Sequence, residues 1–135
     1  CYGALDVAAD GAATRETAIA LAALLPCEVT VHSSPLQRCE QLTQILRGLR
    51  PDLTYKTDAR LAEMDFGAWE GRRWEAIARA ELDAWTGSFA TWACGGAECV
   101  QHFMARVGAA WDDTCAQDQS AGLLRALPAL LLFLS

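Results

Sequence analysis

The sequence predicts an α/β layer fold in which helices pack on a largely parallel sheet. Three observations lead to this prediction. Short runs rich in β-branched residues alternate with amphipathic segments, several amphipathic segments carry local start or stop signals, and 53% of the 135 residues are hydrophobic, which is enough for one core. We therefore expect residues 1–135 to form a single domain.

The first half of the chain reads as helix, strand and helix. Residues 14–25 have apolar side chains at helical spacing, and Pro26 stops that helix. Residues 27–33 carry valines at alternate positions with a threonine between them, which predicts a short strand. A second amphipathic helix follows directly and ends near Gly48.

The start of this second helix has its own local signal. Ser34 is expected to be the N-cap, Pro35 the first helical residue and Gln37 the capping-box partner. The strand, tight turn and helix then form a unit that points free backbone N–H groups and the positive end of a helix dipole at the turn, which suits an anion. Arg38 adds a charge in the first helical turn. It is either a phosphate clamp or a solvated surface side chain, and this stretch alone leaves both interpretations open.

The second half of the chain predicts a short strand and three further helices. The strand covers residues 53–57, and the helices cover 74–85, 98 to about 113, and the apolar tail 123–134. The tail is shorter than the roughly 20 residues that a membrane span needs, so we expect a buried helix and no membrane association.

A stretch dense in glycine, tryptophan and glutamate, residues 60–74, lies between the second strand and the next helix. A carboxyl group near apolar rings loses solvation of its charged form, so Glu63 or Glu70 could supply a general acid. The alternative is that Glu70 caps a turn or pairs with Arg72 or Arg73 and that the aromatic rings belong to the core.

Composition excludes several classes of function. Eleven basic and seventeen acidic residues give a formal net charge of −6, so no overall field attracts nucleic acid or an anionic membrane. The six cysteines form no CxxC pair, and His32 and His102 lie at no metal-like spacing from them, so we expect no metal and no cofactor. Cysteines at apolar helical positions indicate reduced thiols and a cytoplasmic location.

Three segments in series carry a family resemblance: SSPLQR at 33–38, RLAEMDFGAWEG at 60–71 and GGAEC at 95–99. Their order and spacing resemble the histidine phosphatase superfamily, which has the phosphoglycerate-mutase-like fold. The resemblance implies a three-layer fold with helices on both faces of the sheet. It also implies hydrolysis of phosphate monoesters through a phosphohistidine intermediate, with a small phosphorylated molecule as substrate.

The segments CYGALDVAA at 1–9 and DFGAWEGRRWEAI at 65–77 resemble one subgroup, the α-ribazole phosphatases of cobalamin biosynthesis. By this resemblance Arg38 grips the transferred phosphoryl group, with a weaker contribution from Ser34, and Glu63 is the general acid that protonates the leaving oxygen. The GGAEC segment departs from the usual Gly-Gly-Glu-Ser form through Ala97 and Cys99.

The nucleophile is the larger departure. The family uses a histidine in an Arg-His-Gly motif at the end of its first strand, ahead of the segment that matches CYG, and a second histidine at the position that Ser120 matches. We expect the fold to be incomplete at the N-terminus and before Ser120. Neither His32 nor His102 stands where a family nucleophile does.

Three functions follow as alternatives. The first is an α-ribazole 5′-phosphate phosphatase with impaired activity. The second is another phosphatase or a phosphoglycerate-mutase-like enzyme of the same fold, and the third is a non-catalytic protein that binds a phosphorylated ligand. Unpaired strand edges further predict self-association.

Overall fold

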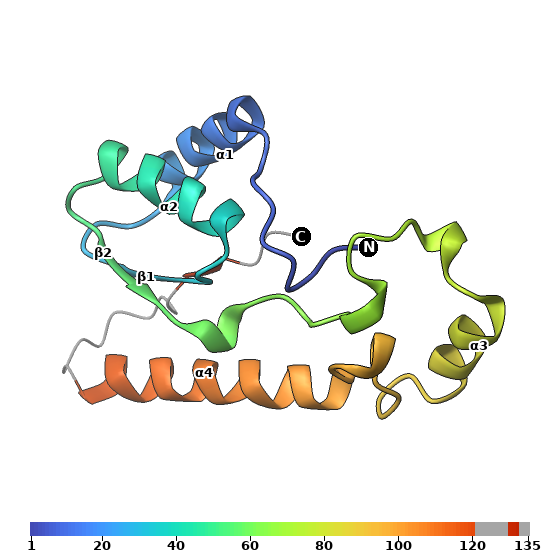
Figure 1. The fold of residues 1–135 in the computed structure, drawn as a ribbon. Helices are drawn as coiled ribbons and strands as arrows, with labels where there is room; N and C mark the ends of the chain where they lie inside the picture. Colours follow the sequence, from blue (N-terminus) through green and yellow to red (C-terminus); the bar gives the residue numbers. More distant parts are fainter. Residues whose placement is uncertain (121–129, 133–135) are drawn as a thin grey trace.

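A short parallel sheet lies between helices in the computed structural model, which describes residues 1–120 and 130–132 (Figure 1). Strands β1 (Thr30–Ser33), β2 (Thr54–Thr57) and β3 (Leu130–Leu132) are arranged in the order β2-β1-β3. Both pairs are parallel. The two strands predicted at 27–33 and 53–57 are confirmed, each somewhat shorter than expected.

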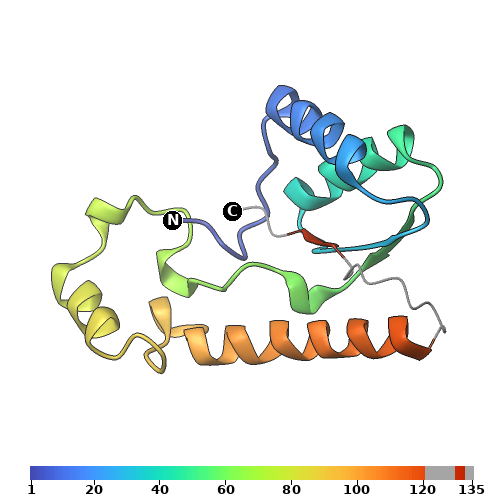
Figure 2. The same cartoon turned by 180° about the vertical axis from the view of Figure 1, so that it is seen from behind.

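Helices cover both faces of this sheet. Helices α1 (Gly11–Leu24) and α2 (Gln37–Leu49) lie on one face and α4 (Val100–Ser120) on the other, as the front and back views show (Figures 1 and 2). The predicted three-layer arrangement with a largely parallel sheet is therefore confirmed. No helix in the described part of the chain is long and apolar enough to cross a membrane.

The core between the sheet and the first helix pair is aliphatic, and its buried members are Ala18, Val31, Leu42, Leu46 and Leu53. Arg50 closes this region by donating to the carbonyl oxygens of Ala22 and Leu25, at 2.8 and 2.7 Å, where α1 ends. It also forms a 2.7 Å ion pair with Asp52. The last carbonyl groups of a helix lack partners within the helix, so this arginine satisfies them from the following turn.

The start of α2 differs from the sequence prediction. The helix begins at Gln37, and Leu36 occupies the N-cap position in an extended conformation without a side-chain cap. The Ser34 hydroxyl instead accepts the Leu36 N–H at 3.2 Å. The predicted capping box over Ser34, Pro35 and Gln37 is wrong, because Ser34 is buried and its hydroxyl closes a tight turn two residues long.

The second region, residues 58–99, is built from short turns around a second core. It contains four single-turn 3-10 helices, Ala59–Leu61, Gly67–Trp69, Trp74–Ala76 and Cys94–Gly96, and helix α3 (Arg79–Gly87). The buried members of its core are Met64, Trp69, Ile77 and Cys94. The continuous helix predicted at 74–85 is wrong at residues 77–78, where Ile77 turns inward and Ala78 is extended.

The last part of the chain contains the largest differences. Helix α4 continues to Ser120, seven residues beyond the predicted end. The prediction of a helix over 123–134 is wrong at Leu130–Leu132, which form β3 beside β1. A short run of leucines has no periodicity that distinguishes a buried strand from a helix. These leucines form a strand because they pair with the side of β1 that β2 leaves free. The rest of that prediction lies outside the described residues.

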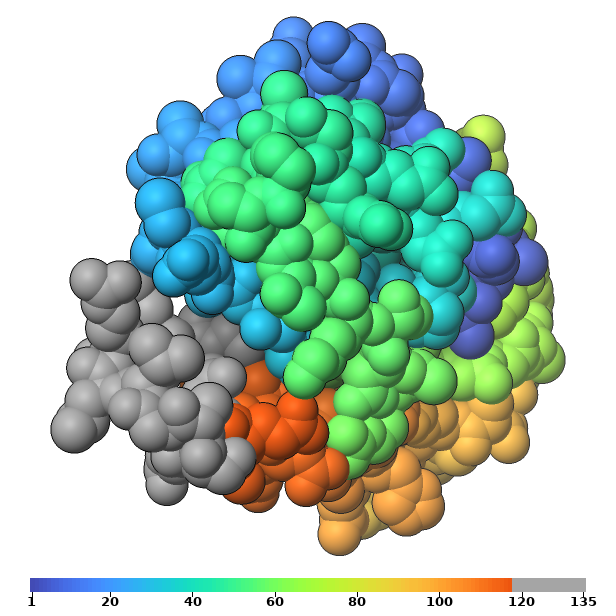
Figure 3. Space-filling model, turned by 90° about the vertical axis from the view of Figure 1, so that its left-hand side faces the viewer, coloured from blue at the N-terminus to red at the C-terminus, as the bar shows by residue number. Residues whose placement is uncertain are grey.

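Strand β2 forms an edge of the sheet. Three of its four residues are exposed, and Figure 3 shows this segment in green at the surface between α2 and α4. The edge carries the charged Lys56, whose ammonium group donates to Gln117 on α4. Self-association through this edge stays a prediction.

Candidate active site

The carboxyl ends of β1 and β2 meet at one edge of the sheet, because the strands are parallel. Strand β1 leads into α2, which carries Arg38 in its first turn. Strand β2 leads into residues 58–66, which carry Glu63. The structure thus places Ser34, Arg38 and the Glu63 segment at the same edge, where open α/β sheets usually bind their ligands.

Ser120 does not join this group. It is the last residue of α4, at the end of that helix that lies away from α3 (Figures 1 and 2). A helix rather than a strand precedes Ser120. Its correspondence to the second family histidine stays a sequence prediction.

Arg38 is a buried side chain, 4% exposed, so the solvated interpretation is wrong. Its Nη2 donates to the carbonyl oxygen of Gly3 at 2.7 Å and its Nη1 to that of Leu5 at 3.2 Å. The guanidinium also lies over the ring of Tyr2, 5.6 Å from its centre. The N-terminal segment therefore fixes the orientation of this arginine.

A cavity of about 290 Å³ adjoins Arg38. It lies between the N-terminal segment, α1 and α2, and its lining includes Tyr2, Thr14, Arg38 and Leu42. Most of the lining is apolar, and its charged residues are Arg38 and Asp10. The apolar part of the cavity suits an apolar moiety, and the Arg38 guanidinium suits an anionic group attached to that moiety.

The N-terminus of α2 already holds a carboxylate of the chain itself. Asp6 Oδ1 accepts the Gln37 N–H at 2.7 Å, and its Oδ2 accepts from the Gln37 side-chain amide at 3.3 Å. The expected attraction of an anion to this helix start is thus seen, but the anion is Asp6. Sequence reasoning missed Asp6 because it lies 31 residues away from its partner.

Glu63 lies on the segment after β2 and is partly buried. Its Oε1 accepts the N–H of Met64 at 2.8 Å. Its carbonyl oxygen accepts from Nη2 of Arg106, on α4, at 3.0 Å. The orientation of the Glu63 segment therefore depends on Arg106.

Arg106 is a further residue that sequence reasoning missed. It donates to the carbonyl oxygens of Arg60 and Ala62 at 2.7 and 2.6 Å and to both carboxylate oxygens of Glu98 at 2.7 and 2.9 Å. The Arg106 guanidinium holds the pKa of the Glu98 carboxyl below its usual range. This bidentate pair fastens the Glu63 segment to α4.

Glu70 is an ionised acceptor rather than a general acid. Its carboxylate accepts the backbone N–H groups of Gly3, Ala4, Leu5 and Phe66 at 2.9 to 3.2 Å. Burial alone would raise the pKa of this carboxyl, but these four donors together hold it below its usual value. A general acid must carry a proton, so the role considered for Glu70 is wrong, and its partners are these amides rather than Arg72 or Arg73.

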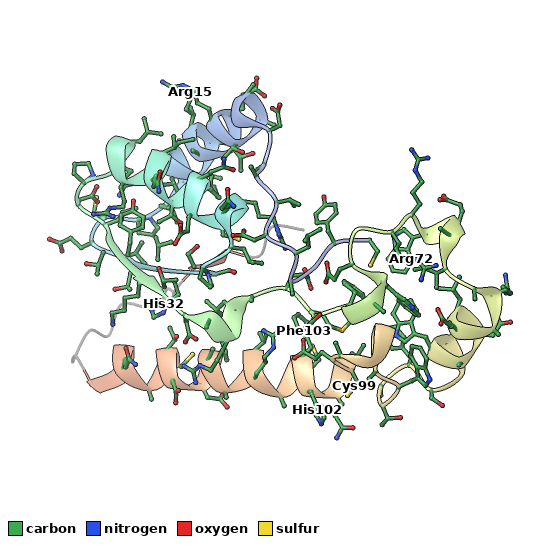
Figure 4. All side chains as sticks on the ribbon, viewed as in Figure 1. Arg15, His32, Arg72, Cys99, His102 and Phe103 are labelled. Carbon is green, nitrogen blue, oxygen red and sulfur yellow. The ribbon has the colours of Figure 1, made fainter. Side chains whose placement is uncertain are left out.

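The two histidines lie on other elements than Arg38, His32 on β1 and His102 on α4. His32 is buried on β1 and points toward the α4 side of the sheet, whereas His102 is exposed and points away from the sheet (Figure 4). Within residues 1–120 and 130–132 no cluster of three potential ligands could hold a metal ion.

The fold, with a buried arginine at the carboxyl edge of a parallel sheet, defines an α/β protein of the kind that binds ligands at that edge. The sequence profile of the histidine phosphatase superfamily (branch 1) matches residues 7–126, and the chain belongs to this superfamily. None of the curated protein sequences compared with the chain matches it.

Solved structures show the same fold. A mycobacterial glucosyl-3-phosphoglycerate phosphatase in complex with VO3 is 27% identical, with a TM-score of 0.72 over 87% of this chain and 59% of that chain. Mycobacterial hydrolase 2 is 24% identical, with a TM-score of 0.67 over 95% of this chain and 56% of that chain. The protein TTHB049 from Thermus thermophilus is 23% identical, with a TM-score of 0.65 over 83% of this chain and 61% of that chain. The chain thus spans somewhat more than half of the length of each.

Proposed function

We propose that this chain contributes the phosphate-gripping and leaving-group side of a phosphomonoesterase site. The observation that carries the proposal is the buried, oriented guanidinium of Arg38 at the carboxyl edge of β1. A guanidinium offers parallel N–H donors to two phosphate oxygens and holds its charge where the phosphoryl group is transferred. Membership of the superfamily supports this role.

The reaction of this superfamily type proceeds in two steps. A histidine attacks phosphorus and the ester bond breaks, while Glu63 gives a proton to the leaving oxygen. Water then attacks the phosphohistidine and releases inorganic phosphate. Neither His32 nor His102 stands where the resemblance places a nucleophile, so we expect the 135-residue polypeptide to bind phosphate without histidine-dependent turnover.

The substrate that we propose is α-ribazole 5′-phosphate, an intermediate of cobalamin biosynthesis. The segments at 1–9 and 65–77 support it by their resemblance to that subgroup. The apolar lining of the cavity beside Arg38 supports it as well, because α-ribazole carries an apolar ring system at a distance from its phosphate. Glucosyl-3-phosphoglycerate, the substrate named for the similar mycobacterial phosphatase, is the competing candidate.

The test is calorimetric titration of the 135-residue chain with inorganic phosphate or vanadate. Hydrogen bonds to a charged group contribute roughly 1.5 to 3 kcal/mol, so Arg38→Ala is expected to weaken binding about ten- to a hundredfold. Arg47→Ala, on the exposed side of the same helix, is the matched control and should bind like the unmodified chain.

Equal affinity in Arg38→Ala and the unmodified chain would reject the proposal. Titration with the two candidate substrates then decides between them. Tighter binding of α-ribazole 5′-phosphate is expected, and a preference for glucosyl-3-phosphoglycerate would replace it.

A further inference from the structure

A short backbone segment, residues 3–5, lies between Glu70 and Arg38 and contacts both. Its N–H groups point to one side, where the Glu70 carboxylate accepts from Gly3 and Leu5 through Oε2 and from Ala4 through Oε1. Two of its carbonyl oxygens, those of Gly3 and Leu5, accept from the Arg38 guanidinium. Glu70 and Arg38 thus hold the same three residues through different backbone atoms.

Residues 3–5 pack tightly against residues 64–66. A Cβ added at Gly3 would lie 2.0 Å from the carbonyl oxygen of Met64 and 2.7 Å from the ring of Phe66. Glu70 also accepts the Phe66 N–H at 3.0 Å. The same carboxylate therefore binds residues 3–5 and Phe66, against which Gly3 packs. The carbonyl oxygens that meet Arg38 are therefore placed by contacts that converge on Glu70.

We propose that Glu70 is a positioning residue for Arg38: its carboxylate fixes residues 3–5, and the carbonyl oxygens of that segment fix the guanidinium in the orientation that grips a phosphate group. This inference rests on the proposed function of Arg38. The chain of contacts runs from the Glu70 carboxylate through the amides of residues 3–5 to their carbonyl oxygens and then to Arg38.

The carboxylate chemistry matters to this role. Each Glu70 oxygen accepts two backbone N–H groups, Oε1 from Ala4 and Phe66, Oε2 from Gly3 and Leu5. A glutamine has the same shape, but an NH2 group replaces one of the two oxygens. That NH2 group is a hydrogen-bond donor, so it cannot accept from the two backbone N–H groups that point at it. Two of the four hydrogen bonds are then lost, either those of Gly3 and Leu5 or those of Ala4 and Phe66.

The test is a double-mutant cycle on the full 135-residue chain, with the affinity for inorganic phosphate as the readout. Glu70→Gln is expected to weaken phosphate binding about tenfold. In the Arg38→Ala background the same substitution should cause no further loss, because the residue through which Glu70 acts is gone. Glu75→Gln, which removes an equal charge from an exposed site nearby, is the control and should leave affinity unchanged.

Urea unfolding of the same proteins separates positioning from stability. Glu70→Gln should lower the unfolding midpoint by a similar amount in both backgrounds, while its effect on phosphate affinity appears only where Arg38 is present. If Glu70→Gln does not fold, Glu70→Asp replaces it. This variant keeps the charge but is one methylene too short to reach the amides, and its phosphate affinity is compared in the same way with and without Arg38.

Unchanged affinity in folded Glu70→Gln, or equal losses in both backgrounds, would overturn this inference and leave the role of Arg38 intact. Unchanged affinity in Arg38→Ala would overturn the proposed function and this inference with it.

Discussion

The guanidinium of Arg106 binds three carbonyl oxygens of residues 60–63 and the carboxylate of Glu98 at once. A lysine in its place has one point charge and cannot span these acceptors. The pair is mostly buried, with side-chain exposures of 25% and 16%. We therefore expect Arg106→Lys to lower the free energy of unfolding by about 2 kcal/mol, measured by urea denaturation.

Arg79→Lys is the control for this substitution. Arg79 pairs with Asp83 on the surface of α3, with its side chain 87% exposed, and exposed pairs contribute little. Its free energy of unfolding should change by no more than about 0.5 kcal/mol. Equal losses in the two variants would mean that Arg106 does not hold the Glu63 segment.

At the scale of elements, two short turns interlock in the second region. The turn Gly67–Trp69 packs against the turn Cys94–Gly96 so closely that Gly95 has no room for a side chain. A Cβ at Gly95 would lie 2.1 Å from the carbonyl oxygen of Phe66, and the φ of Gly95 is +54°. Both the contact and the left-handed backbone favour glycine.

Gly95→Ala is therefore expected to lower the free energy of unfolding by about 2 kcal/mol or more. Gly108→Ala is the matched control, because Gly108 lies inside α4 with nothing within 4 Å of an added Cβ. That variant should be stabilised by roughly 0.5 to 1 kcal/mol. Thermal unfolding followed by circular dichroism measures both, and a neutral Gly95→Ala would contradict the interlocked turns.

At the scale of the whole molecule, hydrogen-bonded carboxylates stabilise both cores. The Arg50 side chain lowers the pKa of Asp52, beside the first core, to about 2 from an ordinary value of 3.8. In the second region, the pKa values of Glu70 and Glu98 lie below their ordinary value of 4.5. The Arg60 side chain likewise lowers the pKa of Asp58, at the start of the second region.

A pKa that is lower in the folded than in the unfolded chain stabilises the fold at every pH above the unfolded value. This stabilisation is lost as the pH falls through the folded value. We therefore expect the urea midpoint to be steady from about pH 7 to about pH 5 and to fall between about pH 4.5 and about pH 2. Glu98→Gln should be less stable at about pH 7 and should show a shallower fall. An unchanged midpoint at about pH 3 would contradict this prediction.

The sequence by itself determined the elements whose signals are local. Strand β1 and helix α2 follow from alternating valines and from apolar spacing, and α1 ends where Pro26 must end it. The series of motifs also indicated the superfamily, which the sequence profile confirms. The resemblance to that superfamily is what assigns Arg38 and Glu63 their proposed roles.

Tertiary structure decided how those residues are held. Asp6 caps a helix 31 residues later, Glu70 binds amides 65 to 67 residues earlier, and Arg106 binds carbonyl oxygens 43 to 46 residues earlier. From the sequence alone, Glu70 is predicted to act as an acid, to cap a turn, or to pair with its neighbours Arg72 or Arg73. A backbone N–H or carbonyl group is present at every position, so a side chain that binds one leaves no mark on its partner's sequence, and only folding selects which backbone groups it meets.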